Sequence, residues 1–182
     1  MIVNVRGNSG SGKTWLTREF MKVCQHPKLI NEGQDIQMEY RKKTWVVLGR
    51  YTTACGGADT VKTQQEIVDR VERYTGKRYN VWLEGLLMST VYGTIGTYSE
   101  KFGPRWLFVY LDTPLEVSIA RIKARRVQAG NTKPLNETNT RNRDATIKRN
   151  REIVLEHGRR VIDVSYKNPL PALLTRIWKE AM

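Results

Sequence analysis

An eight-residue glycine-rich motif near the start of the chain restricts the possible fold more than any other feature. Residues 7–14 read Gly-Asn-Ser-Gly-Ser-Gly-Lys-Thr and match G-x-x-x-x-G-K-[ST] at every fixed position. A short apolar run, Ile2 to Val5, precedes the motif, and apolar residues at helical spacing follow it: Leu16, Phe20 and Val23. This order of strand, turn and helix is the context that the motif requires, and a chance glycine-rich turn does not account for it.

The residue types of the motif suit a bound phosphate group. Glycine lets consecutive backbone N–H groups curve around an anion, and the helix N-terminus adds a favourable dipole. Lys13 is expected to reach the β- and γ-phosphates of a nucleoside triphosphate, and the Thr14 hydroxyl to bind Mg²⁺. The predicted nucleotide-binding residues are Gly7, Asn8, Ser9, Gly10, Ser11, Gly12, Lys13 and Thr14.

Apolar runs and helical patterns alternate along the rest of the chain. The runs Val81–Leu83 and Trp106–Leu111 are wholly apolar, as in strands buried on both faces of a parallel sheet. Capping signals at residues 63–66 and 113–116 precede helical patterns, the second with proline at the expected first helical position. We therefore expect an α/β fold with a doubly wound, mainly parallel sheet of five strands, as one domain over residues 1–182.

The remaining segments predict finer features. Residues 37–40 and 44–48 are expected to form a hairpin or two short strands around Arg41-Lys42-Lys43. Residues 89–102 predict a broken helix. The polar stretch 128–140 contains glycine, proline and three asparagines, so we expect a loop or lid over about residues 126–143. Helical residues 145–155, a strand at 161–164 and a last helix after Asn168-Pro169 complete the pattern.

Composition narrows the class of protein further. The chain has 31 Lys and Arg against 18 Asp and Glu, a formal net charge of +13, which predicts a polyanionic partner. Cys24 and Cys55 are the only cysteines and form no CxxC pair, which argues against a disulfide scaffold or a zinc module. No apolar run approaches the ~18 residues of a membrane helix, and the N-terminus has no secretion signal. We therefore expect a cytoplasmic protein, located in the host cell cytoplasm if the chain is viral.

Much of the positive charge lies in one segment. Residues 121–160 hold twelve Lys and Arg against four Asp and Glu. Arg121 and Arg125 are expected to stabilise charge on a transferring phosphoryl group, and the remaining surplus predicts a surface for nucleic acid rather than a solvated helical face. The predicted DNA contacts are Arg50, Tyr51, Arg126, Arg141, Arg143 and Arg149. Tyr40 and Tyr51 either offer exposed ring faces to a base or pack against the sheet.

The phosphate-binding motif, the polar lid and the order of elements resemble the P-loop kinases, and no N-K-x-D motif of GTPases is present. In those kinases an acidic residue at a strand end helps to hold Mg²⁺ or orients the acceptor. Glu84, directly after Val81–Leu83, is therefore a candidate metal ligand and catalytic residue, the alternative being a surface charge.

Such kinases also place an acceptor-activating carboxylate in the middle of the chain. Asp59 is the candidate, the alternative being a turn residue bonded to backbone. Asp112 is assigned to helix entry, Asp163 receives no role, and Cys55 is taken as an incidental thiol.

Three segments resemble one family more closely, the bacteriophage 5-hydroxymethyluracil DNA kinases. They are residues 6–14, Gly49-Arg50-Tyr51 with Cys55-Gly56-Gly57-Ala58-Asp59, and Leu83-Glu84-Gly85. The resemblance implies ATP and Mg²⁺ as cofactors and DNA carrying modified bases as the partner. It also implies transfer of the γ-phosphoryl group to the hydroxymethyl oxygen of the base, as a step of thymidine hypermodification.

Two other functions remain open. One is a kinase of free nucleosides or nucleotides, or of polynucleotide 5′-hydroxyl ends. The other is a DNA-binding nucleotide switch without kinase activity, although a switch needs no polar lid over the γ-phosphate.

Overall fold

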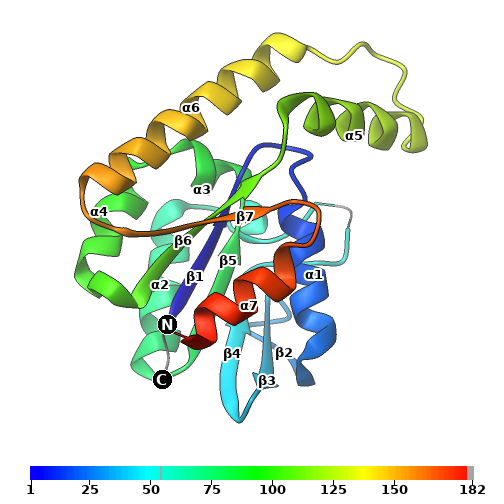
Figure 1. Ribbon diagram of the computed structural model, residues 1–182. Coiled ribbons are helices and arrows are strands. Elements are labelled where there is room, and N and C mark those ends of the chain that lie inside the picture. Colours follow the sequence, from blue (N-terminus) through cyan, green and yellow to red (C-terminus); the bar gives the residue numbers. More distant parts are fainter. Residues whose placement is uncertain (54, 180–182) are drawn as a thin grey trace.

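Seven strands of the computed structural model form one sheet, in the order β2-β3-β4-β5-β1-β6-β7 (Figure 1). The structure describes residues 1–53 and 55–179, and every number of strands or helices refers to those residues. The strands are β1 (Ile2–Arg6), β2 (Gln25–Ile30), β3 (Asp35–Tyr40), β4 (Lys43–Val47), β5 (Asn80–Glu84), β6 (Trp106–Asp112) and β7 (Arg160–Ser165). The helices are α1 (Lys13–Val23), α2 (Gln64–Gly76), α3 (Leu86–Thr90), α4 (Gly93–Phe102), α5 (Leu115–Gln128), α6 (Glu137–Glu156) and α7 (Pro169–Lys179), with 3-10 turns η1 (Ala58–Thr60) and η2 (Gly103–Arg105).

The expected α/β class and mainly parallel sheet are confirmed, but the expected number of strands is wrong. Strands β4, β5, β1, β6 and β7 run parallel to one another, whereas β2 and β3 add an antiparallel extension beside β4. The predicted hairpin joins β3 and β4 through Arg41 and Lys42, which have positive φ angles of 49° and 59°, as tight hairpin turns require. Strand β2 was not expected, because it is an exposed edge strand without an apolar pattern.

Helices cover both faces of the sheet, so the doubly wound arrangement is confirmed. On one face, Leu16 and Phe20 of α1 and Leu173 of α7 pack against the sheet. On the other face, the buried core includes residues of α2, α3, α4 and α6. The ring of Phe20 stacks on Trp82 of β5 at 4.3 Å, and the Trp82 indole N–H donates to Thr17 of α1 at 2.9 Å. These contacts fix α1, and with it the phosphate-binding motif, against the centre of the sheet.

The two predicted capping signals have different outcomes. Thr63 caps α2, since its side chain accepts a hydrogen bond from the backbone N–H of Glu66 at 3.1 Å. At α5 the expected cap is wrong: Pro114 is the N-cap residue and the helix begins at Leu115. The Thr113 hydroxyl instead donates to the carbonyl of Ser11 at 2.9 Å. This bond ties the end of β6 to the phosphate-binding motif.

The predicted lid is largely helical. Helices α5 and α6 project together above the carboxyl ends of the strands, joined by residues 129–136 (Figure 1). Helix α6 begins eight residues earlier than expected, after Asn136, whose side chain accepts from the N–H of Asn139 at 3.2 Å. The expected break in residues 89–102 lies between α3 and α4. Across the described residues, none of the helices has the length and apolar character needed to cross a membrane.

Candidate active site

The phosphate-binding motif forms a tight loop between β1 and α1. The Lys13 ammonium group donates to the carbonyls of Gly7 at 2.9 Å and Asn8 at 3.0 Å. Gly10 has a φ of +76°, and a Cβ atom there would lie 2.4 Å from the carbonyl oxygen of Ser118. The close approach of α5 to the loop therefore requires glycine at this position.

This loop is also held by contacts from other elements, and the sequence did not predict these contacts. The Gly7 N–H donates to the Ser89 hydroxyl of α3 at 3.1 Å, and the Asn8 side-chain amide donates to the carbonyl of Thr140 at 2.9 Å. Thr140 belongs to α6, so the loop contacts the lid directly. The partners lie 82 and 132 residues away in sequence, beyond the reach of a local pattern.

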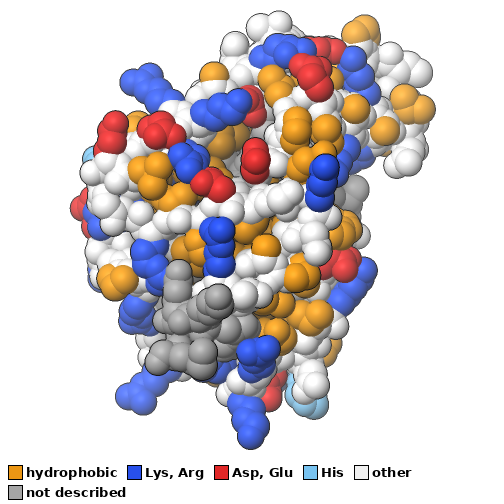
Figure 2. All heavy atoms as spheres, viewed as in Figure 1, with side chains coloured by type: hydrophobic (Ala, Val, Ile, Leu, Met, Phe, Trp, Pro, Cys, Tyr) orange, Lys and Arg blue, Asp and Glu red, His pale blue; other side chains and the backbone are white. Residues whose placement is uncertain are grey.

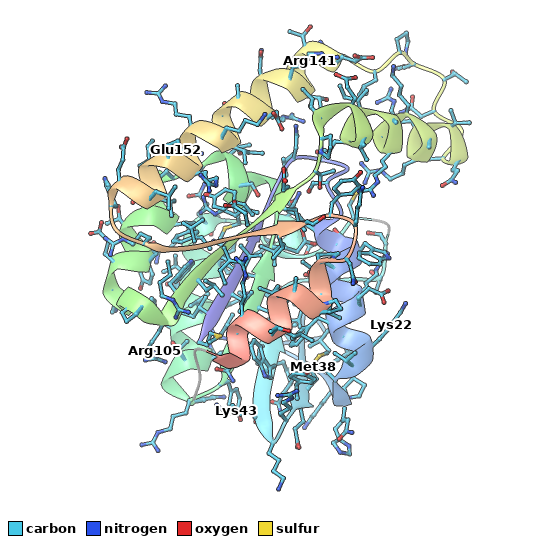
Figure 3. All side chains as sticks on the ribbon, viewed as in Figure 1. Lys22, Met38, Lys43, Arg105, Arg141 and Glu152 are labelled. Carbon is cyan, nitrogen blue, oxygen red and sulfur yellow. The ribbon has the colours of Figure 1, made fainter. Side chains whose placement is uncertain are left out.

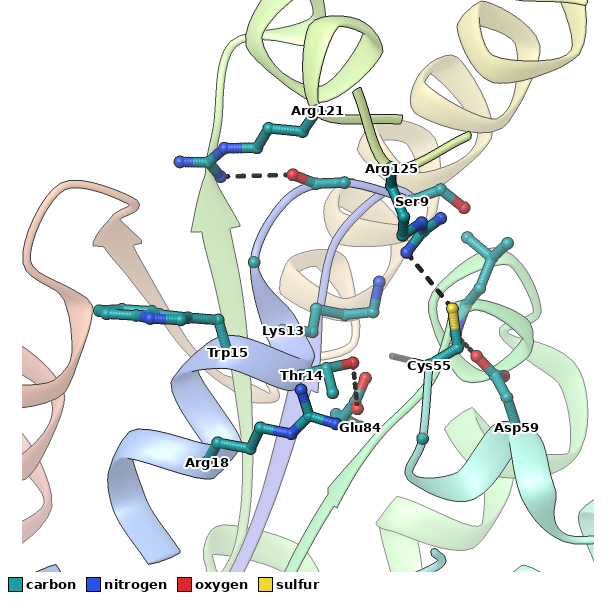
Figure 4. A pocket seen from close by; sticks show the side chains of 14 residues that line it. Ser9, Lys13, Thr14, Trp15, Arg18, Cys55, Asp59, Glu84, Arg121 and Arg125 are labelled. Carbon is teal, nitrogen blue, oxygen red and sulfur yellow. Dashed lines mark hydrogen bonds between the residues drawn. The ribbon is translucent and has the colours of Figure 1, made fainter. Parts of the chain in front are cut away.

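A cleft of about 350 Å³ opens beside the loop and α1 (Figure 4). It brings together every residue predicted to act in catalysis: Lys13, Asp59, Glu84, Arg121 and Arg125. Thr14, the second predicted metal ligand, also lines it. These side chains come from α1, η1, β5 and α5, so the carboxyl edge of the sheet and helix α5 both contribute to the cleft.

Glu84 is the last residue of β5, at the carboxyl edge of the parallel strands, as predicted. It is only 1% exposed, and its Oε1 accepts a hydrogen bond of 2.8 Å from the Thr14 hydroxyl. Burial raises the pKa of Glu84 to about 7, although the Lys13 charge and the Thr14 hydrogen bond oppose the shift. Burial also lowers the pKa of Lys13, against the attraction of Glu84 and Asp59. The alternative of a surface charge at Glu84 is therefore wrong.

Asp59 lies in η1 with both carboxylate oxygens engaged. Oδ2 accepts from the N–H of Leu86 at 2.7 Å, and Oδ1 accepts from the N–H of Leu87 at 3.1 Å. The backbone bonding that was the alternative role for Asp59 is thus present, and it joins η1 to the start of α3. The same carboxylate also lines the cleft, so the two roles are compatible.

The segment that carries Asp59 approaches β5 closely at Gly57. Gly57 has a φ of +75°, and a Cβ atom there would lie 2.5 Å from the carbonyl oxygen of Glu84. Its N–H donates to the carbonyl of Arg50 at 3.0 Å. Glycine at this position therefore lets the two predicted acidic residues approach one another.

A buried ion pair that the sequence did not predict lies next to the start of this segment. Asp35, at the start of β3, is fully buried and pairs with Arg70 of α2 at 3.0 Å. The same carboxylate accepts from the Tyr74 hydroxyl at 2.7 Å, the Asn31 side chain at 2.9 Å and the N–H of Gly49 at 2.8 Å. Gly49 begins the segment that leads to Asp59. No motif indicates this cluster, because its members lie on separate elements.

Three arginines line the cleft, and one of them was not predicted. Arg121 donates to the carbonyls of Gly10 and Ser11, both at 3.3 Å. Arg125 donates to the Cys55 thiol at 3.3 Å. Arg18 of α1 also points into the cleft (Figure 4). It carried no sequence signal beyond its place on the helix after the phosphate-binding motif.

A second pocket of about 490 Å³ adjoins the phosphate-binding loop on the side of α7. Trp15, which is 51% exposed, and Tyr166 line it together with Arg121. The Arg121 guanidinium lies over the Tyr166 ring at 5.3 Å. Aromatic faces next to a phosphate site suit the base of a nucleotide.

The predicted DNA contacts do not gather at one place. Arg126 bonds to Asn131 and Lys133 within the predicted lid. Arg141, which Figure 3 labels near the start of α6, pairs with Glu116 and Glu137. The remaining predicted arginines, Arg50, Arg143 and Arg149, have exposed side chains outside the cleft lining. Lys and Arg side chains are spread over the face shown in Figure 2, with acidic side chains among them on the lid.

The expected exposure of Tyr40 and Tyr51 is wrong. Both rings are partly buried and pack against the core on the α1 face, and the Tyr51 hydroxyl is buried. Tyr40 packs edge-on against Phe20 at 5.8 Å. The alternative, in which these rings pack against the sheet, is therefore the correct one.

Two further acidic residues, Asp163 and Asp112, lie outside the cleft. Asp163 of β7, to which no role was given, pairs with Arg151 of α6 at 2.5 Å. This ion pair joins the lid helix to the edge of the sheet. Asp112 ends β6 with an exposed side chain, three residues before α5 begins.

A phosphate-binding loop at the carboxyl edge of a mainly parallel sheet, faced by carboxylates and arginines in one cleft, is the arrangement typical of phosphotransferases of the P-loop kinase class. No protein-family model matches the chain. Curated relatives do. The chain is 31% identical to the 5-hmdU DNA kinase of Pseudomonas phage PaMx11, over 76% of this chain and 77% of that protein. It is 34% identical to the 5-hmdU DNA kinase of Pseudomonas phage M6, over 74% and 75% respectively. A further relative, the 5-hmdU DNA kinase of Delftia phage PhiW-14, is 28% identical over 76% of this chain and 58% of its own length. The chain belongs to the 5-hmdU DNA kinase family.

Proposed function

We propose that this chain transfers the γ-phosphoryl group of ATP to the hydroxymethyl oxygen of 5-hydroxymethyluracil bases in phage DNA, as a step of thymidine hypermodification. One observation carries the proposal: Lys13, Thr14, Asp59 and Glu84 meet in a single cleft at the phosphate-binding loop, in a chain whose relatives are named 5-hmdU DNA kinases. The proposed place of action is the host cell cytoplasm.

The residues present fit ATP and Mg²⁺. Backbone N–H groups of the motif and the start of α1 form an anion site, and the Ser11 hydroxyl is buried with no hydrogen-bond partner among the described residues. The Thr14 hydroxyl and the Glu84 carboxylate are adjacent oxygen ligands of the kind that Mg²⁺ prefers, with phosphate oxygens completing the coordination. Bound there, Mg²⁺ would neutralise charge on the phosphates. The pocket of Trp15 and Tyr166 would receive the base of the donor.

The chain's own residues supply the remaining chemistry. Lys13 and the α5 arginines Arg121 and Arg125 stabilise negative charge on the transferring group. Asp59 orients the hydroxyl group of the acceptor and accepts its proton as the new O–P bond forms and the β–γ bridging bond breaks. Hydrogen bonds from Leu86 and Leu87 hold the Asp59 carboxylate in place for this task.

The lid and the net charge fit a DNA acceptor. We propose that residues 1–182 act as one domain and that residues 126–143 move as a lid over the bound nucleotide. A net charge of +13 favours a polyanion, and the exposed Arg143 and Arg149 on α6 could contact its backbone.

Transfer of labelled γ-phosphate tests the proposal. Three acceptors are offered: duplex DNA containing 5-hydroxymethyluracil, ordinary DNA with free 5′-hydroxyl ends, and a mixture of nucleosides and nucleoside monophosphates. We expect label on the modified DNA alone, resistant to a 5′-phosphatase. Label on 5′-ends or on small molecules would replace the proposed acceptor. ATP hydrolysis stimulated by DNA, without phosphate on any acceptor, would indicate a nucleotide switch.

A further inference from the structure

Arg18 is held at the rim of the cleft by neutral groups. It lies on α1 four residues after Thr14, so both side chains occupy one face of the helix (Figure 4). Its Nη2 donates to the backbone carbonyls of Tyr51, at 3.3 Å, and Thr53. These bonds fix the guanidinium against the segment that leads to Asp59.

The positive charge of Arg18 has no acidic partner within ion-pair distance in the described part of the chain. Several arginines outside the cleft do have acidic partners, for example Arg70 with Asp35, Arg141 with Glu116, and Arg151 with Asp163. The Nε and Nη1 groups of Arg18 make no hydrogen bond to another described residue. A preorganised guanidinium with free donors at a cleft is suited to a phosphate group, which its planar fork matches.

The position of Arg18 favours a phosphate of the acceptor over one of the donor. Helix α1 begins at the phosphate-binding loop, and a rise of 1.5 Å per residue puts Arg18 about 6 Å further along it than Thr14. Arg121 and Lys13 already face the loop itself. Arg18 instead bonds to carbonyls of Tyr51 and Thr53, in the segment between β4 and η1 that leads to Asp59.

We propose that Arg18 binds a backbone phosphate of the DNA strand, next to the nucleotide whose base enters the cleft. This inference rests on the proposed function, because it assigns the residue that recognises the acceptor as part of a polymer. It also gives a reason for preferring DNA to a free nucleoside: a nucleoside has no adjacent phosphate and loses this contact.

The test pairs a protein variant with a chemical change in the DNA. Short duplexes carry one 5-hydroxymethyluracil, with a neutral methylphosphonate in place of the phosphate on its 5′ or its 3′ side. Equilibrium binding is measured by fluorescence anisotropy, and KM and kcat by phosphate transfer. The proteins are wild type, Arg18→Ala, Arg18→Lys and the control Arg73→Ala, an exposed arginine of α2 outside the cleft lining.

For the wild type, we expect one of the two neutral linkages to weaken binding about tenfold, the scale of a charge-assisted hydrogen bond. Arg18→Ala should weaken binding of the duplex with ordinary phosphates by a similar factor. It should also reduce the slope of the logarithm of the binding constant against the logarithm of the salt concentration by about one. The two changes together should weaken binding no further than either alone, because they remove the same contact. The affinity of Arg18→Lys for the duplex should lie between those of the wild type and Arg18→Ala. Arg73→Ala should bind like the wild type and lose affinity by the same factor when the neutral linkage is introduced.

Two results would overturn the inference. In the first, Arg18→Ala binds the duplex as tightly as the wild type does. In the second, the affinity losses caused by Arg18→Ala and by the neutral linkage multiply, whether the linkage is on the 5′ or the 3′ side. This would mean that Arg18 only holds the segment at Tyr51 and binds neither phosphate. Failure of the proposed function looks different: the binding pattern would persist while no phosphate reached the base.

Discussion

The Thr14 hydroxyl donates a hydrogen bond of 2.8 Å to Oε1 of Glu84, joining the first turn of α1 to the end of β5. Both groups line the cleft, and in the proposed function both supply oxygen ligands to Mg²⁺. Burial raises the pKa of the Glu84 carboxyl group, and the Lys13 charge and this hydrogen bond oppose the shift without cancelling it.

The buried Glu84 should make the free protein less stable as the pH rises. Its pKa is about 7 in the folded chain against 4.5 for an ordinary exposed glutamate, so between these pH values the folded state binds the extra proton. Stability from this group is therefore complete below about pH 4.5 and is lost as the pH passes 7. Near pH 5 the free energy of unfolding of Glu84→Gln, measured with urea, should match that of the wild type. At pH 8.5 it should be higher than that of the wild type by about 2–3 kcal/mol. Glu156→Gln, at an exposed site, should show no such divergence, and parallel curves for Glu84→Gln and wild type would contradict the shift.

Lys13 should be indispensable for phosphate transfer. Its ammonium group is buried at the loop, within hydrogen-bond distance of two loop carbonyls. Lys13→Ala should lower kcat on the order of 10²–10³-fold, the scale for removing one group that stabilises transition-state charge. Lys22→Ala changes an exposed lysine of the same helix and should leave transfer unchanged. Full activity of Lys13→Ala would contradict the entire proposed mechanism.

Asp59 should affect kcat more than binding. Asp59→Asn keeps an oxygen that can accept one of the two backbone N–H bonds but removes the basic carboxylate. We expect kcat to fall by roughly 10²–10⁴-fold, with the KM for ATP little changed. Asp69→Asn, on the exposed face of α2, is the matched control. A normal kcat for Asp59→Asn would leave Asp59 with a structural role only, and Glu84 would become the candidate base.

The buried pair of Asp35 and Arg70 should be costly to break. Asp35→Ala removes the buried carboxylate that pairs with Arg70, which keeps only the half-exposed Glu66 as an acidic partner among the described residues, and frees the N–H of Gly49, so the free energy of unfolding should fall by about 3–5 kcal/mol. The exposed pair of Arg141 and Glu116 offers a contrast, since Arg141→Ala should change stability little. Urea unfolding of both variants measures the difference, and equal effects would show that burial does not govern these pairs.

Local sequence predicted the parts of the molecule that local chemistry decides. The phosphate-binding motif, the cap at Thr63 and the position of Glu84 after a wholly apolar strand all follow from neighbouring residues. Thr113 shows where such reasoning ends: its sequence is that of a helix cap, yet its hydroxyl bonds to Ser11, about a hundred residues away. Asp35 and Arg18 were missed for the same reason, because their roles depend on Arg70 and on the carbonyls of Tyr51 and Thr53.

Strand β2 ends the sheet in a form that resists intermolecular pairing. Its register against β3 shifts between Gln25 and Lys28, and Pro27 has no N–H to offer a further strand. Leu29 is 66% exposed there, next to a lysine. A regular apolar edge of this length would template the addition of strands from other molecules. The irregular edge should therefore keep copies of this chain from joining edge to edge when their concentration is high.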